Sequence, residues 1–147
     1  MSTITRLDDV LTEWKEDNKI DPSRLNNELI RTPLMHSKYL DIYVFFKAKL
    51  SAEEKKFNKT KWIKEKYWRG EMSADELSQY GWSQWQRLKP STQDLARMFD
   101  SDKDLTDIAE KVTYFKTAVA ALEYIMKAIQ SREFTLKTLF EYQKFTG

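Results

Sequence analysis

Between Leu105 and Ile129, apolar side chains recur at alternating steps of three and four residues. The positions are Leu105, Ile108, Val112, Phe115, Val119, Leu122, Met126 and Ile129. This heptad spacing predicts one helix with a continuous apolar seam, about 36 Å long at the rise of an α-helix. Because such a seam must be covered, the chain is expected to pack helices side by side.

The composition favours the same fold class. The chain has 147 residues, with 33% charged and 41% hydrophobic residues but only three glycines and three prolines. That mix is typical of long helices rather than turn-rich sheets. We predict a single all-α domain over 1–147, with amino-terminal helices and a basic arm at about 20–70, a connector at 71–100 and oligomerisation helices at 101–147.

Helix boundaries follow from capping residues and prolines. Pro33 predicts a kink or break because proline cannot donate a backbone hydrogen bond. Ser73 with Glu76 forms a capping-box pattern for a short helix that Gly81 would end. Ser131 and Glu133 predict a turn before a last short helix, so that the carboxy-terminal region would be a helical hairpin. The predicted helices cover about 5–14, 22–31, 33–67, 73–80, 91–99, 101–130 and 134–145.

The seam helix offers two sides to neighbours. Ala118, Ala121 and Ala128 lie off the seam and would let another helix approach closely. One small domain has few helices to cover both sides, so we expect a homo-oligomer built through the carboxy-terminal helices, with the eight seam residues at the interface. In the alternative, the seam meets the stripe between Met35 and Leu50 of the same chain.

Residues for catalysis or metal binding are scarce. His36 is the only histidine, cysteine is absent, and no glycine-rich phosphate loop occurs. Nucleophile–histidine catalysis, thiolate metal sites and nucleotide loops are therefore not expected, and we predict no catalytic residue, metal or cofactor. The lack of cysteine fits a reducing compartment, and no apolar run is long enough to predict a membrane span.

Basic charge gathers in one segment. From Lys47 to Arg69 there are nine lysines or arginines against three glutamates, although the whole chain has a net charge of only +2. Large rings lie among these cations, a pattern that suits phosphates and the faces of unpaired bases. In the alternative, Trp62 and Tyr67 are core residues and the lysines a solvated helix face. The candidate nucleic-acid-binding residues are Lys55, Lys56, Lys59, Lys61, Trp62, Lys64, Lys66, Tyr67, Trp68 and Arg69.

Several short motifs, in their order and spacing, resemble the UvsY recombination mediator family of tailed phages. They are IDPSRL at 20–25, LMHSKYL at 34–40, KWIKEKYWRG at 61–70, SDKDL at 101–105 and MKAIQSREFTLKTLFEYQKFTG at 126–147. In the family's DNA-binding motif, two adjacent aromatics match Tyr67 and Trp68. An arginine of that motif falls on Lys64, and its lysine falls on Trp62 beside Lys61.

The resemblance implies an all-α protein that binds single-stranded DNA and assembles as a ring, seven-membered in one relative, through its carboxy-terminal helices. It implies two protein partners, a RecA-like phage recombinase and a single-stranded DNA-binding protein that the recombinase displaces during presynaptic filament assembly. It implies no ATPase or nuclease activity, no membrane, and a place in the host cytoplasm during phage infection. The rival hypothesis is an oligomeric α-helical adaptor or structural protein that contacts only proteins.

Overall fold

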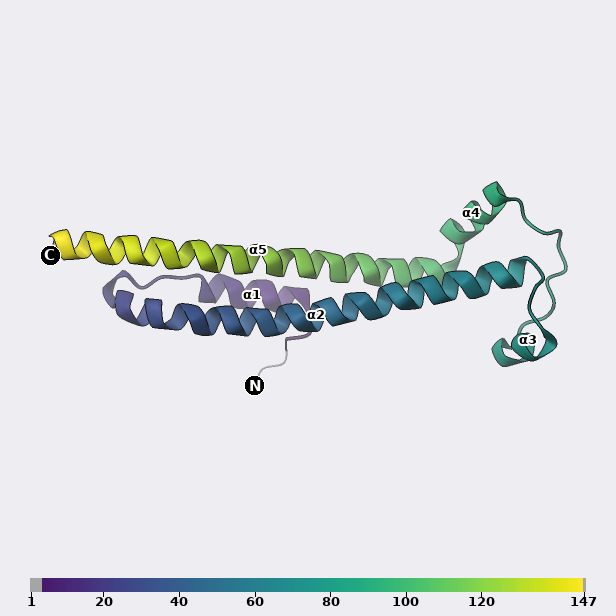
Figure 1. Cartoon of the computed structure of the whole chain (residues 1–147), viewed down its shortest axis with the longest axis horizontal. Coiled ribbons are helices and arrows are strands. Elements are labelled where there is room, and N and C mark those ends of the chain that lie inside the picture. Colours follow the sequence, from purple (N-terminus) through teal and green to yellow (C-terminus); the bar gives the residue numbers. More distant parts are fainter. Residues whose placement is uncertain (1–3, 147) are drawn as a thin grey trace. The chain divides into compact units, whose positions relative to one another are not determined.

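The computed structural model describes residues 4–146, and within them every regular element is helical (Figure 1). The predicted all-α class is confirmed. The elements are α1 (Leu7–Asp17), the short 3₁₀ helix η1 (Pro22–Arg24), α2 (Leu25–Trp68), α3 (Ala74–Tyr80), α4 (Thr92–Ser101) and α5 (Lys103–Thr146).

The described chain forms two compact units. The first combines the residues up to Lys49 with those from Phe115 onward, and the second is Leu50–Tyr114. The long helices α2 and α5 each contribute residues to both units. Each unit therefore has its own core.

The core of the first unit lies among α1, the amino-terminal half of α2 and the carboxy-terminal part of α5. Val10 from α1, Phe46 from α2 and Leu122 from α5 are fully enclosed. The rings of Phe46 and Phe115 are 6.1 Å apart, and α1 (purple in Figure 1) runs beside the start of α2. The stripe predicted on α2 and part of the seam predicted on α5 thus bury one another.

A polar cluster ties the same unit together. The buried guanidinium of Arg132 on α5 donates to the backbone oxygens of Asn18 (2.5 Å) and Lys19 (3.0 Å), and it also contacts the carboxylate of Glu28. Glu28 is paired with Arg31 as well, at 3.0 Å. One arginine therefore joins α5 to the α1–η1 loop and to α2.

A second polar tie joins α1 to α2. The carboxylate of Asp17 accepts hydrogen bonds from the Tyr39 hydroxyl and the Lys38 ammonium, both at 2.8 Å. Burial and the bond to this carboxylate raise the pKa of Tyr39 well above its ordinary value. The phenol therefore stays neutral and acts as a donor.

The second unit combines the carboxy-terminal half of α2, the start of α5, and α3 and α4. Its buried side chains include Trp68, Met72, Leu95, Leu105 and Ile108. As predicted, α3 begins with a capping box. The backbone amide of Glu76 donates to the Ser73 hydroxyl, and the amide of Ser73 donates to the Glu76 carboxylate, both at 3.2 Å. Gly81 then ends the helix in the left-handed conformation, with φ +68°.

Of the kink or break predicted at Pro33, the break is wrong, because α2 runs without interruption from Leu25 to Trp68. The separate helix predicted at 22–31 is likewise wrong, since only Pro22–Arg24 form a 3₁₀ turn before α2 begins. Leu25 before Pro33, and Met35 and Tyr39 after it, are buried in one core. Packing on both sides of the proline outweighs the lost hydrogen bond.

The turn predicted at Ser131–Glu133 is also wrong, and residues 103–146 form one helix rather than a hairpin. Ser131 and Glu133 suggested a loop. Arg132 between them is only 4% exposed, however, and it donates to backbone oxygens of the α1–η1 loop in the same unit. The helix also begins at Lys103, not at the predicted residue 101. The cap is Asp102, whose carboxylate accepts from the backbone amide of Leu105 at 3.1 Å, whereas Ser101 ends α4.

Candidate nucleic-acid interface

One face of α2 carries a row of cations around a single exposed ring. The residues recur at steps of four and three, which places them along one side of a helix for about 21 Å. Trp62, in the middle, is 60% exposed, and the Lys66 ammonium lies 5.2 Å from its ring centroid. We call these residues the basic stripe: Lys55, Lys59, Trp62, Lys66 and Arg69.

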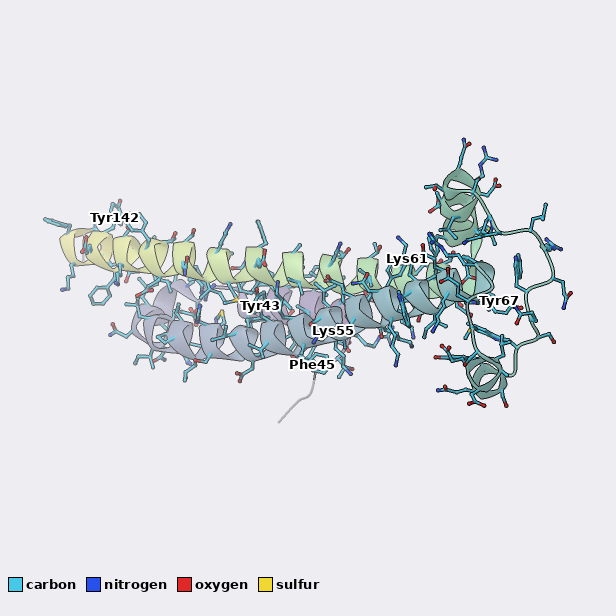
Figure 2. The ribbon with its side chains drawn as sticks, turned by 45° about the vertical axis from the view of Figure 1, so that its right-hand side comes forward. Tyr43, Phe45, Lys55, Lys61, Tyr67 and Tyr142 are labelled. Carbon is cyan, nitrogen blue, oxygen red and sulfur yellow. The ribbon has the colours of Figure 1, made fainter. Side chains whose placement is uncertain are left out.

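The lysines at the start of this region carry uncompensated charge. Within residues 4–146, Lys55, Lys56, Lys59 and Lys61 have no carboxylate within ion-pair distance. Lys61 instead lies 4.8 Å above the Phe99 ring. Figure 2 marks Lys55 and Lys61 on α2. Free ammonium groups along one helix are the arrangement that attracts a phosphate backbone.

Two stripe residues are in ion pairs. Lys66 lies 2.8 Å from Glu76, and Arg69 lies 2.8 Å from Glu65. The carboxylate of Glu76 has a lowered pKa, mainly because of its hydrogen bond from Lys66. Partly exposed pairs of this kind contribute little stability and exchange readily with other anions. These cations thus extend the stripe, although less strongly than the free lysines.

Lys64 is placed differently from its neighbours. It is largely enclosed, and its ammonium lies 2.9 Å from Asp104 and 3.2 Å from Asp102. Burial lowers the pKa of Lys64, but the hydrogen bonds to the two carboxylates outweigh burial and leave the pKa raised. The hydrogen bond from Lys64 lowers the pKa of Asp104. This lysine joins α2 to the start of α5.

We predict that Lys64→Gln lowers the free energy of unfolding by about 2 kcal/mol, because it removes charged hydrogen bonds in a partly buried place. Strand binding should keep its wild-type dependence on salt, since this ammonium is already neutralised. Urea unfolding and a salt titration check the two parts. Asp104→Asn should give a smaller stability loss in the same direction. Unaltered stability with a weaker salt dependence would instead make Lys64 a phosphate contact.

The other two predicted rings are less exposed than Trp62. Trp68 is buried beside Phe99, with centroids 5.6 Å apart. Tyr67 packs against Trp82 (4.9 Å) and Trp85 (5.6 Å), and its hydroxyl donates to the Ser83 backbone oxygen at 2.8 Å. Of the three rings predicted for base contacts, Trp62 is the one placed at the surface.

The seam residues are mostly covered by their own chain. Leu105 and Ile108 are buried in the second unit, and Val119, Leu122 and Ile129 in the first, while Val112, Phe115 and Met126 are partly exposed. The alternative in which the seam packs within one chain accounts for this burial.

Other apolar side chains in the first unit face solvent. Those on α5 lie in the region predicted to form the oligomerisation helices, but none of them is one of the eight seam residues. The most exposed are Ile30, Leu34 and Val44 on α2 and Tyr124, Phe134, Tyr142 and Phe145 on α5, with Phe145 at 93%.

Neither a metal site nor a membrane span is found where the structure describes the chain. Residues 4–146 contain no group of three or more histidine, cysteine or carboxylate side chains placed to hold a metal ion. None of the helices there is long and apolar enough to cross a membrane.

Comparison with known proteins defines the class to which this fold and surface belong. Residues 13–147 match the family model described as "Recombination, repair and ssDNA binding protein UvsY". The class is thus that of all-helical proteins described by their role in recombination and repair and by binding of single-stranded DNA. The chain belongs to the UvsY family.

Solved structures share the fold. Crystal structures of the bacteriophage T4 recombination mediator protein UvsY superpose with TM-scores of 0.82 for lattice types II and IV and 0.80 for lattice type I. Sequence identity is 22%, 22% and 21%. The alignments cover 97%, 96% and 95% of this chain and 98%, 99% and 99% of the T4 chain. A search of curated proteins gives no match.

Proposed function

We propose that this protein is a recombination mediator that holds single-stranded DNA on the basic stripe and helps a RecA-like phage recombinase replace a single-stranded DNA-binding protein. The observation that carries the proposal is the exposed Trp62 between cations on one helix face. Membership of the UvsY family supports it.

Binding follows from the chemistry of the stripe. Lys55 and Lys59, with Lys61 on the adjoining side of the helix, neutralise successive phosphates and release counterions. The ring of Trp62 stacks on one unpaired base, an interaction of about 1–3 kcal/mol that tolerates any sequence. Bases in a duplex are already stacked, so the stripe favours single strands.

A second copy of this chain is the proposed partner of the exposed apolar residues in the first unit. Monomeric proteins rarely leave so many large apolar side chains in water. The carboxy-terminal part of α5 carries three of these side chains, Phe134, Tyr142 (labelled in Figure 2) and Phe145. Native mass measurement should give a closed homo-oligomer, and Tyr142→Glu with Phe145→Glu should shift the mass towards the monomer.

Oligomerisation strengthens strand binding. One stripe spans about 21 Å and contacts only a few nucleotides, so its own affinity is modest. Once one subunit holds a strand, contacts by its neighbours are effectively intramolecular, and overall affinity rises steeply. A strand bent over several subunits then binds the competing single-stranded DNA-binding protein less well. The proposed action is by binding alone, without ATP hydrolysis or a cofactor.

The test measures recombinase assembly on a strand already covered by single-stranded DNA-binding protein. Adding the wild-type chain should shorten the lag before recombinase filaments form, and a variant with neutralised stripe lysines should not. A wild-type chain that binds the strand but never shortens the lag would contradict the mediator role. Failure of the wild-type chain to bind the strand even at low salt would instead favour the rival hypothesis of an adaptor or structural protein that contacts only proteins.

A further inference from the structure

The second unit contains a cavity beside the basic stripe. Its volume is about 420 Å³, within the range of small-ligand sites. The walls come from α2, the start of α5, and the end of α3 with the loop that follows. The residues that matter below are Lys56, Ile63, Tyr80, Trp82, Ile108 and Lys111.

Two rings of the connector form a stack at this cavity. The centroids of Tyr80 and Trp82 are 4.8 Å apart, and the rings are inclined by only 23°. Trp82 is also contacted by Tyr67, whereas Trp82 is the one ring partner of Tyr80 within the described chain. Tyr80 is 38% exposed. Tyr80 thus lines the cavity and keeps part of its surface exposed, and another flat group placed there would extend the stack by one layer.

The charges around the cavity suit a phosphate as well as a ring. Of its acidic residues, Asp104 is neutralised by Lys64 at 2.9 Å, and Asp107 lies 3.6 Å from Lys103. Lys56 and Lys111 have no carboxylate partner within residues 4–146. The site thus combines two available cations, the partly exposed ring of Tyr80 and an apolar lining from Ile63 and Ile108.

Position connects the cavity to the stripe. Lys56 follows Lys55, so its side chain lies about 100° further round the same helix. A strand that runs along the stripe can turn one nucleotide towards the cavity without leaving α2. Tyr80 and Trp82 of the connector would then contact the strand together with α2, although they lie outside the basic segment of the sequence.

We propose that this cavity receives one unpaired nucleobase of the bound strand, stacked on Tyr80, while Lys56 and Lys111 hold the flanking phosphates. The inference rests on the proposed function, since it adds a base-recognition site to the same strand. Base stacking and phosphate contacts are the two elements of sequence-tolerant strand binding.

The experiment compares an oligo-thymidine strand with an abasic strand of equal length, which has phosphates but no bases. Tyr80→Ala should weaken binding of the oligo-thymidine about tenfold, within the contribution of one stacked base, and leave abasic binding unchanged. Tyr80→Phe keeps the ring and should bind like wild type. Lys111→Gln should weaken both strands alike, and Lys111→Arg should not.

The outcomes separate the two proposals. If the wild-type chain fails to bind oligo-thymidine, the proposed function fails. If the wild-type chain binds but Tyr80→Ala and Lys111→Gln bind equally well, the base site alone is overturned. Equal loss on both strands in Tyr80→Ala also overturns it, because that pattern shows a structural role for the ring. Circular dichroism of each variant checks that the helices remain.

Discussion

Arg132→Ala is expected to lower the free energy of unfolding by about 3 kcal/mol. Breaking a buried ion pair from one side costs roughly 3–5 kcal/mol, because the remaining charge is left uncompensated. Glu28 keeps its pair with Arg31 at 3.0 Å, which places the loss at the lower end. The backbone oxygens of Asn18 and Lys19 also lose their buried donor.

Urea unfolding measures this loss, and two further variants serve as comparisons. Arg132→Lys keeps the charge but not the planar fork that reaches three acceptors, so part of the loss should remain. Lys137→Ala removes the exposed pair with Glu133 on the same helix and should alter stability by less than about 0.5 kcal/mol. Wild-type stability in Arg132→Ala would show that this cluster does not hold the first unit together.

Neutralising Lys55, Lys59 and Lys61 together with glutamine should reduce strand affinity about a hundredfold near 0.1 M salt. A plot of the logarithm of the binding constant against the logarithm of salt concentration has a negative slope. Each lost phosphate contact makes that slope less steep by about 0.7 for single strands, so three lost contacts make it less steep by about two. None of the three lysines has a carboxylate partner within the described residues, so stability should stay close to that of the wild type.

A matched control separates local contacts from net charge. Lys15, Lys116 and Lys127 are exposed, lie in the first unit, and give the same change in net charge when replaced by glutamine. This control should keep the wild-type slope. Equal slopes for both triple variants would mean that the strand senses overall charge rather than the stripe.

The sequence predicted the fold class and the character of α2 better than the helix ends. Period and capping residues are local, so the seam, the capping box at Ser73 and the Gly81 stop could be found without a structure. Pro33 and Arg132 could not be placed correctly, because partners far along the chain decide their roles. Local propensity favoured breaks, and tertiary packing overrode it.

The candidate site shows the same limit. Composition identified residues 47–69 as basic and aromatic, but it could not separate exposed Trp62 from buried Trp68 six positions later. That difference depends on where α5 and the connector lie. Lys64 likewise forms ion pairs with Asp102 and Asp104, which lie far from it in the sequence. Tyr80 and Trp82 were not predicted as nucleic-acid contacts, since their neighbours in sequence form no row of basic residues and a tryptophan in such a connector is more often a buried anchor.

The central claim is that a strand lies on the solvent face of α2 around Trp62. Photocrosslinking with an iodouracil-containing strand, followed by peptide mass spectrometry, tests it most directly. We expect a dominant crosslink at Trp62, with others confined to residues 55–69 and the neighbouring cavity. Crosslinks found only between residues 115 and 146, with Trp62 unmodified, would contradict it.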